Sequence, residues 1–276
     1  MTSKKLPKII VVCGPTATGK SDYAVELAKK IGGEIISADS RQVYKGMDIG
    51  SGKITKKEMR GVPHYMLDII SPKKTYTAGQ FKIDTDKIIT EILQRKKVPI
   101  LCGGTGFYID AVVKNIVFPN VLPNPKLRKQ LEKKNLEQLK KILGKLDPER
   151  LKTVDQNNKV RLVRSIEIAK ELGKVPTLIS EPKYNTKIIY LDFKDEVLKK
   201  RIHDRLIKRI KQGMIEEVKT LHEEGISWKR LFEFGLEYRY VSLFLRGKIT
   251  KEKMISELEN EIWHFVKRQR TWFKKH

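Results

Sequence analysis

A glycine-rich segment near the start of the chain has residue types and a spacing that can bind phosphate. Residues 14–21 read GPTATGKS, which fits the complete P-loop pattern and lies between an apolar run and a helical stretch. The glycines let backbone amides surround an anion, and the side chain of Lys20 adds a positive charge. The hydroxyl of Ser21 is suited to Mg2+, which would bridge phosphate oxygens. We therefore expect a diphosphate or triphosphate, with Mg2+ as cofactor, to be bound by Gly14, Pro15, Thr16, Ala17, Thr18, Gly19, Lys20 and Ser21.

The motif alone does not identify the ligand as a nucleotide. Enzymes that hydrolyse ATP normally also carry an apolar strand that ends in an acidic residue holding Mg2+. Here the apolar run VPILC at 98–102 is followed by the acid-free turn GGTG at 103–106. Asp192 and Asp68 also end apolar runs, and we predict structural roles for both. The glycine string at 50–53 lacks P-loop spacing and is interpreted as a loop. These features disfavour a plain NTPase.

Asp39 follows the apolar run 34–38, at the expected carboxyl edge of a sheet, where open α/β folds bind ligands. A carboxylate there can take the proton of an amine while the amine attacks an electrophile. The polar residues that follow Asp39 also allow a different role, because Asp and Ser are good helix caps. The sequence alone therefore leaves a catalytic base and a structural cap as two open interpretations of Asp39.

The composition predicts a polyanionic partner. The 276 residues include 58 Lys and Arg against 33 Asp and Glu, a formal net charge of +25. Such an excess is self-repulsive unless a polyanion such as RNA offsets it, although a solubility surface would have the same composition.

Cys13 and Cys102 end apolar runs, which indicates buried thiols in a reducing compartment and no zinc site. The chain has neither a signal-peptide pattern nor an apolar stretch long enough for a membrane span. We therefore expect a cytoplasmic protein with no membrane partner. Nothing in the sequence suggests an obligate dimer seam, so we also expect a monomer.

Strand-like and helix-like segments alternate through much of the chain. Apolar, β-branched runs at 8–13, 34–38, 98–102 and 187–193 predict strands. In the helix expected at 20–31, the side chains of Tyr23, Leu27 and Ile31 recur every four residues on one apolar face. The alternation predicts an α/β fold, in which a parallel sheet has helices on both faces.

A linker rich in proline and asparagine begins near residue 118 and interrupts this alternation. From 126 to 172 the sequence is helical in pattern and very basic, with no candidate strand. We therefore expect a core domain formed by 1–115 and 186–276, with a helical insertion domain at 116–185. The tail at 267–275 reads KRQRTWFKK, and we expect its aromatics to be buried and its cations to face RNA.

Several segments, in order along the chain, resemble the tRNA dimethylallyltransferase (tRNA isopentenyltransferase) family. They are GPTATGKS, SADSRQVYKGMDIG, VPHYMLDIISP, VPILCGGTGFYIDAVV, VRLVRSIEI, GMIEEVKTL and VKRQRTWF. The family uses Mg2+ to transfer the dimethylallyl group of dimethylallyl diphosphate to the exocyclic amine of the adenosine 3′ of the anticodon, and diphosphate is released. The resemblance implies a P-loop NTPase-like core with a helical insertion, and the anticodon stem-loop of tRNA as partner. Two segments depart from the family pattern, namely GSGKI at 50–54 and Leu236 in GLEY.

The resemblance also implies roles for individual residues. Asp39 would be the catalytic base, and Thr105 would lie near the reacting centre with a hydroxyl that can donate to the bridging oxygen of the diphosphate. Gln42 could read an adenine edge, because its amide has a donor and an acceptor. Arg161 and Arg164, three apart on one helix face, would contact tRNA. The implied tRNA-binding residues are Asp39, Ser40, Arg41, Gln42, Thr105, Arg128, Val160, Arg161, Leu162, Val163 and Arg164.

Other functions remain open at this point. One alternative is a P-loop small-molecule kinase with Arg205 and Arg209 as cations on ATP, and another is a non-catalytic RNA-binding protein switched by nucleotide. Both leave the pairing of DSRQ at 39–42 with GGTG at 103–106 unexplained. An adenylate isopentenyltransferase acting on free AMP would share the P-loop, but the basic charge and the VRLVR segment favour tRNA.

Overall fold

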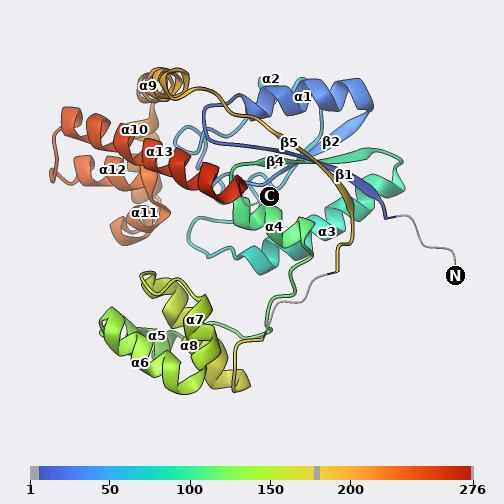
Figure 1. Cartoon of the computed structure of the whole chain (residues 1–276). Helices are drawn as coiled ribbons and strands as arrows, with labels where there is room; N and C mark the ends of the chain where they lie inside the picture. The colour runs from blue at the N-terminus through green and yellow to red at the C-terminus, as the bar shows by residue number, and fades with distance from the viewer. Residues whose placement is uncertain (1–5, 177–180, 275–276) are drawn as a thin grey trace, which may run out of the picture. The chain divides into compact units, whose positions relative to one another are not determined.

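Parallel strands form the central sheet of the computed structural model, which describes residues 6–176 and 181–274 (Figure 1). They are β1 (Lys8–Cys13), β2 (Gly33–Ser37), β3 (His64–Tyr65), β4 (Val98–Gly103) and β5 (Asn185–Tyr190), in the order β3-β2-β4-β1-β5. The predicted strands and the parallel α/β class are confirmed, with strand ends that shift by a few residues. The very short β3 was not predicted, because two paired residues leave no periodic pattern.

Helices cover both faces of the sheet, as predicted (Figure 1). Successive side chains of a strand point to opposite faces, so neighbouring residues join different cores. Val11 and Leu101 pack with side chains of α3 (Ala78–Gln94) and α4 (Gly106–Val113). Val12 and Ile100 pack on the other face with α1 (Lys20–Ile31).

The buried face of α1 differs from the predicted one. Tyr23 is 41% exposed, whereas Ala24 and Ala28 are fully buried against the sheet. Small side chains let the helix backbone lie close to the strands, and a pattern based on large apolar residues does not reveal this. The expectation for Tyr23 is therefore wrong, while Leu27 and Ile31 do pack at the edge of this core.

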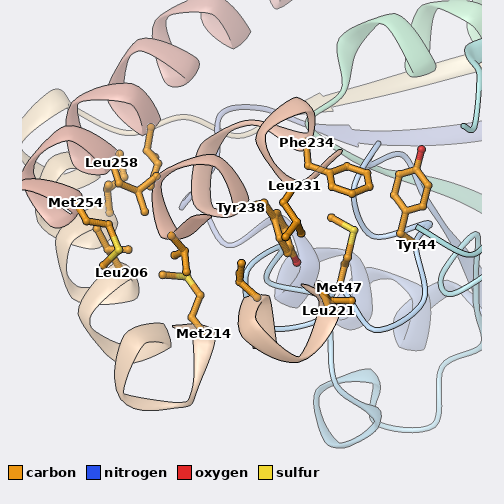
Figure 2. Close-up of a cluster of buried hydrophobic side chains, with 14 of the residues drawn as sticks. Tyr44, Met47, Leu206, Met214, Leu221, Leu231, Phe234, Tyr238, Met254 and Leu258 are labelled. Atoms are coloured by element: carbon orange, nitrogen blue, oxygen red, sulfur yellow. The ribbon is translucent and has the colours of Figure 1, made fainter. Parts of the chain in front are cut away.

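The described residues after β5 form a helical layer around a third hydrophobic core, part of which Figure 2 shows. The helices are α9 (Asp195–Lys211), α10 (Met214–Glu223), α11 (Trp228–Phe234), α12 (Leu236–Leu245) and α13 (Lys251–Phe273). Leu206 of α9 and Leu258 of α13 are buried in this core. Tyr44 and Met47, from the loop after β2, join it. The helical layer therefore anchors the loop that begins at Asp39.

A separate helical unit interrupts the chain between α4 and β5. Contacts divide the chain into Met1–Asn115 with Glu181–His276, and Ile116–Ser180. The second unit contains α5 (Pro125–Glu132), α6 (Leu136–Leu146), α7 (Pro148–Thr153) and α8 (Lys159–Leu172). Leu139, Leu143 and Leu162 form the centre of its own core.

One further helix, α2 (Lys56–Met59), lies between β2 and β3 and begins with a capping box at Thr55 and Glu58. Within residues 6–176 and 181–274, each helix is either too short or too polar to cross a membrane.

Candidate active site

The P-loop segment joins the end of β1 to the start of α1, as the sequence predicts. Gly14 has a φ of 140°, and a Cβ there would lie 2.0 Å from the carbonyl oxygen of Leu191, so a larger residue does not fit. Gly19 has left-handed backbone with a φ of 78° and forms the N-cap of α1, without a side-chain cap. The first amides of this helix are therefore available to an anion.

The amine of Lys20 lies against the loop itself. It donates to the carbonyl oxygen of Pro15 and, at 3.4 Å, to the hydroxyl of Thr18. Burial lowers the pKa of Lys20 to about 8, and the guanidinium of Arg205 acts in the same direction, while the carboxylate of Asp39 opposes them. An arriving phosphate would favour the charged amine, because it would supply the anionic partner that a buried cation needs.

Asp39 lies just past β2, in an arrangement that accommodates both interpretations of the sequence. Its Oδ1 accepts hydrogen bonds from the backbone N–H of Arg41 at 2.7 Å and of Gln42 at 3.3 Å, so it caps the turn. Its Oδ2 has no hydrogen-bond partner among the described residues, and the side chain lines the same cavity as the P-loop. The carboxylate is therefore fixed through one oxygen and can accept a proton at the other.

Thr105 follows β4 and adjoins the loop that carries Asp39. Its hydroxyl oxygen accepts from the N–H of Ser40 at 3.1 Å, and its own N–H donates to the carbonyl oxygen of Ala38 at 3.1 Å. Gly103 permits this approach, since a Cβ there would lie 2.2 Å from the same carbonyl oxygen. The turn after β4 and the loop after β2 are thus joined, and the hydroxyl proton of Thr105 can still be donated.

Arg41 and Gln42 are engaged within the protein. The Nε of Arg41 donates to the carbonyl oxygen of Phe234 at 2.7 Å. The amide of Gln42 accepts from the hydroxyl of Ser37 at 3.0 Å and donates to the carbonyl oxygen of Gly52 at 3.3 Å. Both side chains therefore anchor the loop after β2, and their contact with tRNA stays a prediction.

A cavity of about 420 Å3 brings these segments together at the carboxyl ends of the strands. The predicted site residues in its lining are Thr16, Ala17, Gly19, Lys20, Ser21, Asp39 and Gln42. Arg201, His64 and Gln269 also line it and were not predicted as site residues. Arg205, which the sequence assigned to ATP in the kinase alternative, lies here too. His64 and Gln269 lie in two of the segments that carry the family resemblance, VPHYMLDIISP and VKRQRTWF, whereas Arg201 and Arg205 lie on α9. The fold brings all four to the P-loop.

Oxygen donors suited to Mg2+ are present at this cavity. Ser21 lies in the first turn of α1, and the carboxylates of Asp22 and Asp39 line the same space. Mg2+ prefers oxygen ligands and usually takes only one or two carboxylates, the rest being phosphate oxygens and water. Among the residues that the structure describes, no three His, Cys, Asp or Glu side chains cluster as a complete metal site. The donors therefore fit an ion that binds together with a diphosphate.

The predicted tRNA-binding residues of α8 differ in exposure. Leu162 is fully buried and Val163 is 8% exposed, so their side chains pack in the core of the insertion, where Ile166 is also buried. Val160 is 77% exposed, and Arg161 is exposed with an ion pair to Asp155 at 3.9 Å. Val160 and Arg161 are therefore the two that present side chains to solvent.

Arg128 and Arg164 instead surround a buried carboxylate. Arg128 makes two hydrogen bonds of 2.7 Å to Glu167, and Arg164 donates to Glu167 at 3.3 Å and to the carbonyl oxygen of Val121 at 2.8 Å. Burial opposes the ionisation of Glu167, but these hydrogen bonds hold its pKa below the ordinary value. Arg164 therefore stabilises the insertion, and Arg161 and Arg164 are not an equivalent pair.

Asp192 and Asp68 have structural partners, which confirms the prediction for both. Arg270 donates to the two oxygens of Asp192 at 2.9 and 3.0 Å, and Lys53 pairs with Asp68.

The expectation that the cations of the tail at 267–275 face RNA is wrong for Arg270, because its guanidinium is engaged by Asp192. Of the other tail residues, Lys267 and Arg268 are exposed, and Lys275 lies outside the described residues.

The two segments that depart from the family pattern each contain a residue with left-handed backbone, Gly52 and Leu236. Gly52 has a φ of 62°, and a Cβ there would lie 1.7 Å from a guanidinium nitrogen of Arg209. Arg209 pairs with Glu237 at 3.1 Å, so it is engaged within the protein and is a poor candidate for an ATP-binding cation. Leu236 has a φ of 39°, a left-handed conformation that is uncommon for a residue with a branched side chain.

Known proteins resemble this chain along nearly its whole length. The sequence model of a family described as IPP transferase matches residues 42–276. A protein named tRNA dimethylallyltransferase 2, from Treponema denticola, is 44% identical over 272 residues, covering 96% of this chain and 91% of that protein. A tRNA dimethylallyltransferase 1 from Syntrophus aciditrophicus is 41% identical over 275 residues, covering 98% and 90% of the two chains.

Solved structures agree with this similarity. A tRNA delta(2)-isopentenylpyrophosphate transferase from Staphylococcus epidermidis is 36% identical with a TM-score of 0.71, covering 97% of this chain and 90% of that one. A eukaryotic dimethylallyltransferase, described as acting on tRNA, is 28% identical with a TM-score of 0.83, covering 96% of this chain and 69% of that one.

Proposed function

The chain belongs to the IPP transferase family of tRNA dimethylallyltransferases, and we propose how its residues divide the work of the transfer. The dimethylallyl group of dimethylallyl diphosphate moves to the exocyclic amine of the adenosine 3′ of the anticodon in tRNA. A bond forms between the amine nitrogen and C1 of the allyl group, and the bond between C1 and the bridging oxygen breaks. The amine loses one proton to a carboxylate, and diphosphate leaves.

The observation that supports this division best is the shared cavity. The P-loop and Asp39 line one space of about 420 Å3, so a leaving group and a base can act on the same substrate. A diphosphate in the P-loop would direct C1 toward the loop after β2. In this proposal the amine of the adenosine attacks C1 from the side opposite the bridging oxygen.

The P-loop binds and neutralises the leaving group in this proposal. The backbone amides at the start of α1 and the amine of Lys20 face the diphosphate, and Arg205 adds a second cation within the same cavity. The hydroxyl of Ser21 would hold Mg2+, which supplies positive charge to the departing oxygens. Charge that develops in the transition state is stabilised most by groups already in place, such as the backbone amides at the start of α1. The amine of Lys20 would exchange its bond to the carbonyl oxygen of Pro15 for one to the diphosphate.

Asp39 is the proposed base. The lone pair of an adenine amine is delocalised into the ring, so the amine is a weak nucleophile. A carboxylate that removes its proton localises the pair while the new bond forms, and such help is worth about 100- to 10,000-fold. The capping bonds to Oδ1 fix the carboxylate, and Oδ2 is available to receive the proton.

Thr105 is proposed to assist departure of the leaving group. Its hydroxyl oxygen is held by the N–H of Ser40, so its proton is free to point at the bridging oxygen of the diphosphate. A hydrogen bond there would strengthen as negative charge grows on that oxygen.

The formal charge of +25 supports an anionic macromolecule as the acceptor. We assign the anticodon stem-loop of tRNA to this role, with the exposed Arg161 on a phosphate and the loop 40–42 near the target base. The base must leave its stack to reach Asp39, at a cost of a few kcal/mol.

A comparison of acceptors tests this assignment against two of its rivals, the adenylate enzyme and the small-molecule kinase. The protein, Mg2+ and labelled dimethylallyl diphosphate are incubated in parallel with unmodified tRNA and with AMP, and ATP turnover is followed separately. Transfer to tRNA with none to AMP is expected. Transfer to AMP alone would support the adenylate enzyme, and ATP turnover with a small-molecule acceptor would support the kinase.

A further inference from the structure

Gln269 of α13 connects two segments of the candidate active site that lie far from it in sequence. Its Oε1 accepts a hydrogen bond from the backbone N–H of Thr16 at 2.9 Å, across 253 residues of sequence. Its Nε2 donates to the carbonyl oxygen of Gly104 at 2.9 Å. The side chain is 5% exposed and lines the same cavity as the P-loop.

Both segments joined by Gln269 are close to the proposed chemistry. Thr16 belongs to the P-loop, and Gly104 directly precedes Thr105 in the turn after β4. A single buried amide therefore sets the distance between the diphosphate-binding loop and the turn that carries Thr105. A Cβ on Gly104 would lie 2.3 Å from the Nε2 of Gln269, so the amide occupies the space that a side chain there would need.

Neighbouring residues hold Gln269 in place. Arg270 makes a two-pronged ion pair with Asp192 just after β5. One turn of helix away, the indole Nε1 of Trp272 donates to the buried carboxylate of Asp110 in α4 at 3.1 Å. These contacts tie the end of α13 to the segment after β5 and to α4, so the residues beside Gln269 are held by the core domain.

We propose that Gln269 is a positioning residue for the allyl transfer, an inference that rests on the proposed function. By holding the amide of Thr16 and the carbonyl of Gly104, it keeps the diphosphate-binding loop and the Thr105 turn at the separation that in-line displacement requires. A shift of about 1 Å between reacting groups can lower a rate by about 100-fold. Gln269 thereby affects binding of the diphosphate and the chemical step, and leaves binding of tRNA unchanged.

Three variants separate this role from simple packing. Gln269→Met has similar volume and removes both hydrogen bonds. Gln269→Glu keeps the acceptor for Thr16 but, when ionised, opposes the carbonyl oxygen of Gly104. Thr271→Val is the matched control, because Thr271 is exposed on the same helix. Within the part of the chain that the structure describes, its hydroxyl bonds only to the carbonyl oxygen of Lys267.

We expect Gln269→Met to lower kcat/KM for dimethylallyl diphosphate by roughly 10- to 100-fold. The KM for tRNA and the melting temperature should stay close to those of Thr271→Val. The activity of Gln269→Glu relative to the wild type should rise as the pH falls, because a protonated Glu regains a donor for Gly104. Calorimetry with inorganic pyrophosphate in Mg2+ should detect weaker binding to Gln269→Met, with no need for transfer activity.

Inorganic pyrophosphate separates failure of this inference from failure of the proposed function. A wild type that binds pyrophosphate but prenylates no tRNA would reject the function and leave the role of Gln269 measurable. Equal pyrophosphate binding and equal kcat in Gln269→Met and the wild type would overturn the positioning role. A loss of activity that merely follows a loss of melting temperature, with no pH-dependent recovery in Gln269→Glu, would also overturn it.

Discussion

The hydroxyl oxygen of Thr105 accepts a hydrogen bond from the backbone N–H of Ser40 at 3.1 Å. This bond joins the turn after β4 to the loop after β2. The strands β2 and β4 are parallel neighbours in the sheet. The hydroxyl proton of Thr105 takes no part in this bond and can be donated to a ligand. The bond therefore couples the position of the proposed base, one residue before Ser40, to that of the proposed donor.

Replacement of Thr105 tests whether its hydroxyl assists the leaving group. Thr105→Val keeps the shape but loses the donor, so we expect kcat to fall by about 100-fold. Thr105→Ser retains the hydroxyl and should keep most of the activity. Single-turnover transfer at saturating tRNA measures the chemical step. Equal rates for the Val and Ser variants would assign Thr105 to the turn alone.

Asp39 has two separable functions, and two substitutions distinguish them. Asp39→Asn keeps an Oδ1 that can cap the turn but removes the base, so turnover should fall by about 100- to 10,000-fold while tRNA binding and melting temperature are retained. Asp39→Ala loses the cap as well, so its free energy of unfolding should be lower by about 1 kcal/mol and its melting temperature should fall. Filter binding with tRNA and thermal melting are the checks. Loss of tRNA binding in Asp39→Asn equal to the loss of rate would make Asp39 structural.

The lowered pKa of Lys20 predicts that diphosphate binding depends on pH. Burial lowers its pKa to about 8, so the amine is charged below this pH and loses its charge as the pH rises through it. We expect pyrophosphate affinity to decrease as the pH rises through about 8, as measured by calorimetry in Mg2+. Lys20→Arg stays charged over this range and should lack that decrease. A decrease of the same size in both proteins would assign the titration to another group.

Arg161 and Arg164 should give different phenotypes. Arg161 is exposed, so Arg161→Ala should weaken tRNA binding and reduce the slope of log affinity against log salt by about 1, with stability unchanged. Arg164 hydrogen-bonds the buried Glu167, so Arg164→Ala should destabilise the insertion by about 1.5 to 3 kcal/mol. Binding titrations at several salt concentrations and urea unfolding measure the two effects. An unchanged salt slope in Arg161→Ala would remove this residue from the tRNA interface.

Features with a local sequence signature could be predicted. The strands at 8–13 and 98–102 are continuous apolar runs, and the P-loop has its complete spacing, so short-range pattern was enough for each. Asp39 was expected to be either a base or a helix cap, and in the structure it caps a turn that does not continue into a helix. The exposure of Tyr23 was missed, because the close approach of α1 depends on small residues and not on the largest apolar ones.

Contacts between distant segments could not be predicted in this way. The hydrogen bond between Thr16 and Gln269 spans 253 residues and leaves no local trace. The same holds for Arg270, whose cationic neighbours suggested RNA although its partner is Asp192. The burial of Glu167 explains why Arg128 and Arg164 bind a carboxylate, and a single sequence gives no measure of that burial.

The central claim is that one cavity uses its P-loop to bind a leaving diphosphate and Asp39 to activate an adenosine of tRNA. The most direct test is a single-turnover reaction of wild type and Asp39→Asn with Mg2+, labelled dimethylallyl diphosphate and unmodified tRNA, followed by nuclease digestion and mapping of the label. The account predicts label on the adenosine 3′ of the anticodon with an equal amount of diphosphate released by the wild type, and almost none by the variant. Label elsewhere, no label on tRNA, or equal rates for the two proteins would contradict it.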